Sequence, residues 1–281
     1  MPVAVIDIGT NTTRLLVAEI EDGRVVELER RTVITSLGQG VDSSGRLAQE
    51  AMDRVSEAIA VYREVIDRLG VDRVVALATS AMRDAENGPE FRDHLKQRFG
   101  IDPRTISGDE EARLTFLGAT SERYDDGKSV VIDIGGGSTE YVVGRPGHDP
   151  EFHVSTQMGS VRFTERFENL EEMAAAVGET VPDVSVEQGI AVAGTATSLA
   201  AIDGAEQIHG YRLSLAACER MVAMLAAMSL EERRQVKGLH PDRAPTIVAG
   251  AVILTESVRR VGLDEVEVSD RDLLHGAAAA S

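Results

Sequence analysis

The sequence predicts an α/β fold built from two related domains. Its 281 residues are many for one small domain and typical of two, since domains usually have roughly 100–200 residues. Segments typical of strands alternate with segments typical of helices through both halves. One phrase, Val5–Val17, occurs again at Val131–Val143, with seven of thirteen positions identical. The offset of 126 residues is too long for a solenoid repeat and suits two homologous domain cores.

The first half begins with a predicted β-hairpin. Two apolar runs flank the turn DIGTNTT and together span Val3 to Ile20. Apolar residues then recur at helical spacing from Leu47 to Leu69, and Gly70 ends that helix. A strand follows at Val74–Ala78 and runs into a loop. Two helices come next, one at Glu90–Phe99 and one from Ser107.

The second half contains the second hairpin, Val130–Gly144, after a turn at Asp125–Lys128. Further helices are expected at Val161–Val177, after Gly194, at Ser214–Met228, Leu230–Lys237 and Ala244–Val261, and up to Ala280, with strands at Ile190–Ala193 and Glu265–Ser269. We therefore expect one domain over residues 1–120 and another over 121–281, packed closely around a cleft. The last helix is expected to pack back on the first domain.

The amino-acid composition indicates a globular protein and argues against binding to nucleic acid or membranes. An apolar fraction of 43% supports a real core, and 47 acidic against 29 basic residues give a net charge of −18. Binding to nucleic acid or to an anionic membrane would call for a basic stripe, so neither partner is expected. The chain starts directly with a strand, so we expect no signal peptide, and no apolar stretch is long enough to span a bilayer.

The only cysteine is Cys218, so an intramolecular disulfide is excluded. This fits a reducing cytosol, and we expect a cytoplasmic protein. The setting of this cysteine, LAACERMVAML, is helical and apolar. It indicates a small core side chain rather than a nucleophile.

Both hairpin turns have the composition of a phosphate-binding loop. Glycine lets a phosphate approach backbone N–H groups with no Cβ in the way, and hydroxyls add further donors. The residues concerned are Thr10 and Asn11 in the first turn and Gly135, Gly136, Gly137 and Ser138 in the second. One such turn could simply be a tight hairpin, but two copies favour phosphate binding.

Three acidic residues belong to the same hairpins. Asp7 and Asp133 each end a strand just before the turn, and Glu140 follows the second turn. Carboxylate oxygens beside a bound phosphate suit Mg²⁺, which keeps several of its waters. The alternative, an aspartate that only accepts hydrogen bonds from turn N–H groups, is stronger for Asp7 than for Asp133.

Three more candidates lie outside the hairpins. Gly194 and Thr195 form a turn between a strand and a helix, an arrangement typical of phosphate binding and also of close packing. Arg83 follows a strand and could clamp a phosphate or pair with nearby acids. In SGDEEARL, Ser107 and Glu110 fit a capping box, which leaves Glu111 free. The sequence supports two interpretations of Glu111 equally: a base that faces the cleft, and an exposed acid in the solvated first turn of the helix.

Five blocks in this order resemble the exopolyphosphatase/guanosine pentaphosphate phosphohydrolase (Ppx/GppA) family: VAVIDIGTNTTRLLV, ATSAMRDAENG, ISGDEEARLTFLG, VVIDIGGGSTEYVVG and VAGTATSLAAI. The resemblance spans nearly the whole chain. It implies two ribonuclease-H-like domains of the actin/sugar kinase/Hsp70 superfamily, and Mg²⁺-dependent hydrolysis of a terminal phosphoanhydride. It favours Glu111 as the base that activates water, Asp133 and Glu140 as acids near the metal, and Arg83 as a phosphate contact.

Longer family members continue with an HD-like helical domain and a further domain, whereas this chain resembles the short actinobacterial form. We therefore expect an exopolyphosphatase that prefers short polyphosphate. The alternatives are hydrolysis of pppGpp or nucleoside triphosphates, a non-catalytic sensor of polyphosphate or phosphorylated guanosine nucleotides, and kinase-type chemistry, which the SGDEEARL block disfavours. A homodimer is one option for the assembly. Because the protein and a polyanion repel each other, we expect basic residues at the mouth of the site, with Arg14, Arg83, Lys128, Arg162 and Arg166 as candidates.

Overall fold

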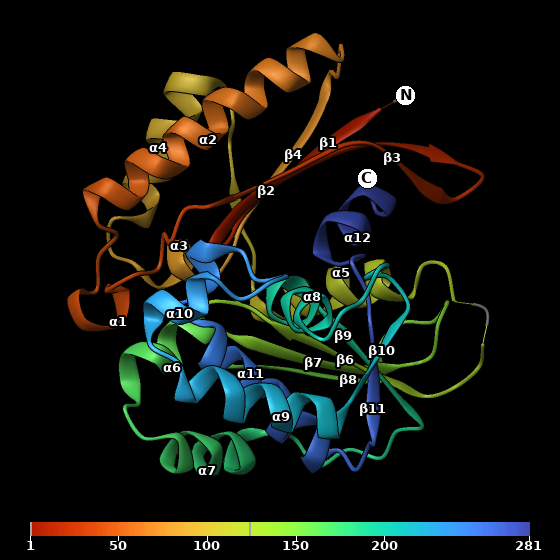
Figure 1. Cartoon of the computed structure of the whole chain (residues 1–281). Helices are drawn as coiled ribbons and strands as arrows, with labels where there is room; N and C mark the ends of the chain where they lie inside the picture. Colours follow the sequence, from red (N-terminus) through yellow and green to blue (C-terminus); the bar gives the residue numbers. More distant parts are fainter. Residues whose placement is uncertain (1, 124) are drawn as a thin grey trace.

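The computed structural model describes residues 2–123 and 125–281, which form two α/β domains, each around one mixed sheet (Figure 1). The first sheet has the order β3-β2-β1-β4-β5, with strands Arg24–Ile34, Thr12–Glu21, Val3–Ile8, Arg73–Ala78 and Arg104–Thr105. The second has the order β10-β11-β9-β6-β7-β8, with strands Tyr211–Ser214, Glu265–Val268, Gln188–Val192, Ser129–Ile134, Thr139–Gly144 and Phe152–Thr156.

The duplicated phrase forms the centre of each sheet. Strand β1 pairs antiparallel with β2 and parallel with β4, and β6 pairs in the same way with β7 and β9. Asp7 lies opposite Arg14 in the first hairpin, and Asp133 lies opposite Glu140 in the second. The sequence prediction of two related α/β domains is therefore confirmed, whereas the exact boundary at residue 120 stays a prediction.

Helices cover both faces of the first sheet. On one face, the core is formed with α2 (Gln49–Arg68) and α4 (Gly88–Phe99), and the short α1 (Val41–Ser44) and α3 (Ser80–Asp84) adjoin it. On the other face, α12 (Leu273–Ala279) packs against β1 and β2, and α5 (Gly108–Thr120) packs against α12 and adds Leu114 to the same core. The last helix thus lies on the first sheet, although the chain before it belongs to the second (Figure 1).

Helix α5 is shared between the domains. Its Leu114 belongs to the core under the first sheet, while its Ala112 and Phe116 pack on Val131 and Val142 of the second sheet. The first turn of α5 therefore lies where the two domains meet. This position brings Glu111 to the boundary between them.

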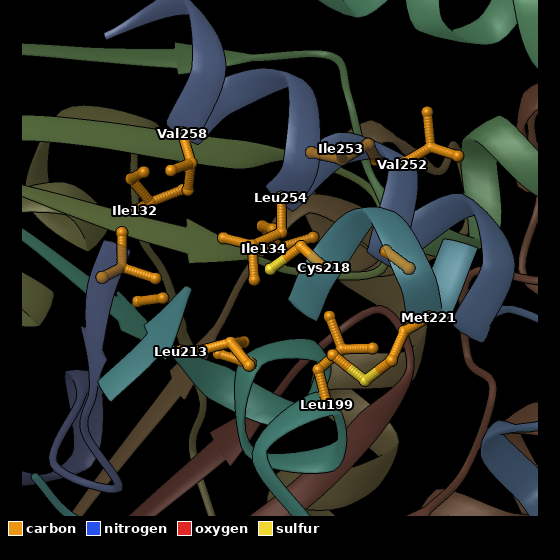
Figure 2. Packing of buried hydrophobic residues seen from close by; sticks show 14 of the residues in the cluster. Ile132, Ile134, Leu199, Leu213, Cys218, Met221, Val252, Ile253, Leu254 and Val258 are labelled. Atoms are coloured by element: carbon orange, nitrogen blue, oxygen red, sulfur yellow. The ribbon is translucent and has the colours of Figure 1, made fainter. Parts of the chain in front are cut away.

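The second domain has a large core on its other face. It is formed with α6 (Ser160–Arg166), α7 (Leu170–Thr180), α8 (Ala193–Ile202), α9 (Leu215–Ala227) and α11 (Ile247–Arg260), with α10 (Leu230–Arg234) and the 3₁₀ turn Pro241–Arg243 at its edge. Figure 2 shows Cys218 among Ile134 and Leu254 in this core. Burial raises the pKa of its thiol to about 12, so the expected core role of Cys218 is confirmed.

Several predicted elements were wrong in detail. The helix expected over Val161–Val177 is two helices, because the chain extends at Phe167 and the Asn169 side chain accepts hydrogen bonds from the first N–H groups of α7. The loop expected after Ala78 contains α3. Strands β3, β8 and β10 were missed: β3 because its exposed, charged residues hide the strand pattern, and β8 and β10 because each has only four or five residues. Within the described residues, no helix has the length and apolar character to cross a membrane.

Candidate active site

The two hairpin turns face each other across the domain boundary. Each is closed by a hydrogen bond, from Gly9 N to Thr12 O (2.9 Å) and from Gly135 N to Ser138 O (3.0 Å). A Cβ on Gly136 would lie 3.1 Å from the Asn11 nitrogen, and one on Gly137 would lie 2.5 Å from a side-chain oxygen of α3. Glycine is therefore required in the second turn because the first domain approaches it so closely.

A cavity of about 860 Å³, counting the part open to solvent, lies at this meeting point. Both turns, the first turn of α5, the start of α8 and the segment before α12 line it. It collects all the predicted site residues except Arg83 and Glu140, namely Asp7, Thr10, Asn11, Glu111, Asp133, Gly135, Gly136, Gly137, Ser138, Gly194 and Thr195. Asp7 and Thr195, which are 188 positions apart in the sequence, thus line the same cavity.

Glu110 and Glu111 point to different surroundings. The Ser107 side chain caps α5 by accepting a hydrogen bond from the Glu110 backbone N–H, at 3.2 Å. The Glu110 carboxylate does not complete the expected capping box and instead forms two 2.6 Å hydrogen bonds with Arg104 at the surface. Glu111 is buried, at 9% exposure, and lines the cavity. This settles the geometric question that the sequence left open, because Glu111 faces the cleft and not solvent.

The Glu111 carboxylate is only partly neutralised. Its Oε2 accepts no hydrogen bond in the described part of the protein, and the nearest cation is Arg83 Nη1 at 3.6 Å. Burial, followed by the charges of Glu140, Asp133 and Asp7, raises its pKa well above the usual range, while Arg83 acts in the opposite direction. These surroundings favour the protonated form of Glu111, and a bound cation would favour the ionised form.

The second hairpin supplies two more carboxyls with raised pKa values. Burial and then Glu140 raise the pKa of Asp133 to about 8, and its Oδ2 accepts a 3.2 Å hydrogen bond from Thr115. Glu140 lies behind the cavity wall at 1% exposure, and burial raises its pKa even though Ser155 donates a 2.7 Å hydrogen bond to it. The site thus concentrates acids that cost free energy to ionise without a compensating cation.

Arg14 organises the acids of the first domain. Its Nη2 and Nε donate to Asp7 Oδ2 at 2.6 and 2.9 Å, and its Nη1 donates to Asp272, which caps α12. Arg14 keeps the pKa of Asp272 far below its usual range against the effect of burial. The pKa of Asp7 is nevertheless raised by burial, and its Oδ1 has no hydrogen-bond partner in the described residues.

Sequence reasoning missed Arg243, which also lines the cavity. Its guanidinium lies so close to Gly194, at the start of α8, that a Cβ on this glycine would be 1.8 Å from Nη1. No acidic side chain of the described residues lies within ion-pair distance of it, and burial, with the charge of Arg14 second, lowers its pKa to about 10. A half-buried guanidinium without an anion is suited to receive one. Its sequence context, HPDRAP, carries no recognisable signal for this role.

The other cations proposed from the sequence lie elsewhere. Lys128 pairs with Glu151 at 2.8 Å, and Arg166 packs on the Phe167 ring at 5.0 Å. Arg162 lies in a neighbouring crevice, and Arg83 approaches the site only through Glu111. Of the five candidates, only Arg14 lines the main cavity.

The carboxylates do not form a complete metal cage. Among the described residues, no group of three or more His, Cys, Asp or Glu side chains is arranged to hold a metal ion. Mg²⁺ does not need such a cage, because it commonly binds one or two carboxylates together with substrate phosphates and water. The unpartnered Asp7 oxygen and the ionisation-resistant Asp133 fit such a site.

Known proteins resemble this chain over nearly its whole length. Residues 16–280 match the model of the Ppx/GppA phosphatase family. Exopolyphosphatase 2 of Mycobacterium tuberculosis is 36% identical over 98% of this chain and 97% of its own. The crystal structure of an exopolyphosphatase-like protein is 34% identical with a TM-score of 0.93, over 99% of this chain and 97% of that one. An exopolyphosphatase from Cytophaga hutchinsonii is 28% identical with a TM-score of 0.89, over 98% and 96%. The chain therefore belongs to the Ppx/GppA phosphatase family and is an exopolyphosphatase-like hydrolase.

Proposed function

We propose that the protein hydrolyses the terminal phosphoanhydride of short inorganic polyphosphate, with Mg²⁺, and releases orthophosphate. The observation that carries the proposal is the Glu111 carboxylate. It is buried, its Oε2 has no hydrogen-bond partner within the described residues, and it lines a cavity walled by two phosphate-type turns. A polar atom left unpaired at this depth costs free energy that a reacting water would recover.

In the proposed reaction, Glu111 accepts a proton from the water that attacks the terminal phosphorus. The bond from that phosphorus to the bridging oxygen breaks, and the remaining chain leaves with the bridging oxygen. Backbone N–H groups of Gly136 and Gly137, with the hydroxyls of Thr10 and Ser138, hold the terminal phosphoryl oxygens. Positioning and electrostatic stabilisation of this kind supply most of the catalysis in phosphoryl transfer.

Basic residues at the cavity hold the rest of the substrate. Arg243 is the strongest candidate, because it lines the cavity and has no carboxylate partner among the described residues. Gly194 and Thr195 lie beside Arg243. A second phosphoryl group bound at this point would therefore contact Arg243 as well as Gly194 and Thr195. A chain that extends beyond the cavity would have to cross the surface of a protein with a net charge of −18. This supports a short substrate.

The metal would be held by Asp133 and Asp7, with Glu140 behind them. When bound, Mg²⁺ would neutralise charge on the substrate and on these acids. Asp133 is a better metal ligand than Asp7, because Arg14 already donates two hydrogen bonds to one carboxylate oxygen of Asp7. A bound cation would also favour the ionised form of Glu111 that accepts the proton.

The test is phosphate release from tripolyphosphate, long polyphosphate and pppGpp with Mg²⁺. Glu111→Gln should lower kcat for tripolyphosphate by about 10²–10⁴, the usual contribution of a general base, and should leave binding nearly unchanged. Glu110→Gln is the matched control, because it alters the next residue but removes a surface pair with Arg104. Its kcat should stay close to that of the wild type.

Other results would move the function elsewhere. Release from pppGpp alone would assign the protein to guanosine pentaphosphate hydrolysis. Tight binding of tripolyphosphate without release from any substrate would make it a sensor.

The buried lone cysteine supports a reducing, cytoplasmic location, and a homodimer is tested by light scattering of the purified protein.

A further inference from the structure

A second, smaller crevice of about 250 Å³ lies between the domains beside the main cavity. Helix α6 of the second domain forms one side of it, and α1 and α3 of the first domain form the other (Figure 1). Arg162 of α6 lies in this crevice with its side chain only 17% exposed. None of the roles proposed above uses this side chain.

The Arg162 guanidinium joins three separate segments. Its Nε donates a 2.8 Å hydrogen bond to Gly137 O in the second phosphate turn. Its Nη1 lies 2.6 Å from Asp42 Oδ1 on α1, and its Nη2 lies 3.2 Å from Asp84 Oδ2 on α3. Two of its three partners therefore belong to the opposite domain. Glu165, also on α6, accepts a 3.1 Å hydrogen bond from Gly40 N and adds a second link across the boundary.

One arm of this arrangement leads to the catalytic base. Asp84 Oδ1 lies 3.6 Å from Arg83 Nε, and Arg83 Nη1 lies 3.6 Å from Glu111 Oε2. The other arm ends at Asp42, whose side chain contacts Arg162 and no other charged group of the described residues. The two acids thus differ, because only Asp84 connects the crevice to the main cavity.

We propose that Arg162 is a latch between the domains: it holds the second phosphate turn against α1 and α3 and sets the fraction of molecules whose cleft is closed around substrate. Arg162 is a positioning residue, since it does not line the main cavity. The inference rests on the proposed function, because the closed cleft matters only if substrate binds there. A weaker latch would raise the apparent dissociation constant in inverse proportion to the closed fraction.

The first measurement is the distance between the domains, which needs no turnover. Spin labels are attached at Glu57→Cys on α2 and Glu172→Cys on α7, two exposed positions in different domains. Cys218 is fully buried, so the label spares it. Asp42→Asn and Arg162→Gln should each add a population at longer distance. Asp67→Asn is the matched control, because it breaks a pair with Arg63 inside one helix.

The second measurement is kinetic, with tripolyphosphate and Mg²⁺. Asp42→Asn should raise KM by about three- to tenfold, as expected when the closed fraction falls by that factor, and should change kcat by less than about twofold. Asp84→Asn should raise KM and also lower kcat, because it frees Arg83 beside Glu111. Asp67→Asn should change neither constant.

Two results would overturn the latch. One is an unchanged distance distribution in both Asp42→Asn and Arg162→Gln. The other is a loss of kcat in Arg162→Gln at unchanged distance, which would assign Arg162 to the Gly137 turn alone. If the wild type releases no phosphate from tripolyphosphate, the proposed function fails, whereas the distance measurement still decides the latch.

Discussion

Replacing Asp133 by asparagine should abolish activity and at the same time stabilise the fold. Burial and the neighbouring Glu140 raise the pKa of this carboxyl from 3.8 to about 8. Because the folded pKa lies above the unfolded one, the folded state binds the proton more tightly. The carboxyl's contribution to stability is therefore complete below pH 3.8 and is lost as the pH rises towards 8.

The size of the effect follows from this difference. At pH 7 the wild type is less stable than at a pH low enough to keep this carboxyl protonated in both the folded and the unfolded state. The difference is equivalent to about three pKa units, or ~4 kcal/mol at 1.36 kcal/mol per unit. The asparagine side chain carries no charge, so it avoids most of this loss of stability. Its carboxamide is still a buried polar group, and its burial costs ~1–2 kcal/mol. The Thr115 hydroxyl can still donate its hydrogen bond to the carboxamide oxygen. We therefore expect Asp133→Asn to raise the free energy of unfolding by about 2 kcal/mol at pH 7.

The assay is urea unfolding of both proteins at several pH values with EDTA present. The difference between them should grow from pH 5 to pH 7.5 and should shrink when Mg²⁺ is added, since a bound cation stabilises the wild-type carboxylate. Asp67→Asn, at an exposed position, controls for the loss of an acidic charge. A variant no more stable than the wild type at pH 7 in EDTA would refute the reasoning, as would a difference that does not grow with pH.

Three further predictions concern packing and charge. Gly118→Ala should lower the free energy of unfolding by about 3 kcal/mol, because its Cβ would lie 1.9 Å from Asp272 O and force α5 and α12 apart. Arg14→Gln should cost about 3–5 kcal/mol in the same urea assay, because it leaves buried Asp7 without its cation and buried Asp272 with only the more distant Arg30, at 3.9 Å. Arg243→Met should raise KM for tripolyphosphate about tenfold or more without lowering stability, because this guanidinium has no acidic partner among the described residues.

Each of these has a control or a contrary outcome. Gly178→Ala is the counterpart of Gly118→Ala, since a Cβ on Gly178 in α7 meets nothing within 4 Å and should stabilise the helix by ~0.5–1 kcal/mol. Equal effects of the two substitutions would contradict the packing argument. An unchanged urea midpoint for Arg14→Gln would contradict its central place among the acids. A KM unaffected by Arg243→Met would remove this residue from the substrate site.

The sequence predicted the parts of the site that lie within short phrases. The turns around Asp7 and Asp133 could be read because their glycines and hydroxyls stand beside a strand. The cap at Ser107 separated Glu111 from Glu110, although only the shared packing of α5 shows that Glu111 reaches the cleft. The grouping of these residues in one cavity agrees with the resemblance to the family.

The remaining parts depend on contacts that no local pattern records. Arg243 and Asp272 enter the site from segments far along the chain, and each has a sequence context typical of an ordinary helix start. The edge strand β3 is mostly exposed on both faces, so it lacks the alternation that identifies a strand. Arg162 is one of the basic residues that we expect at the mouth of the site, but two acids of the other domain neutralise it in a neighbouring crevice.

The position of α12 has a consequence for the order in which the chain folds during synthesis. Its residues Leu273, Leu274, Ala277 and Ala278 complete a core whose other members include Val3 and Leu16 at the opposite end of the chain. While the ribosome makes the second domain, one face of the first sheet lacks the helix that will cover it. The first domain to emerge is therefore among the last to be finished, and its exposed strands have to wait, without aggregating, while about 150 further residues are made between α5 and α12.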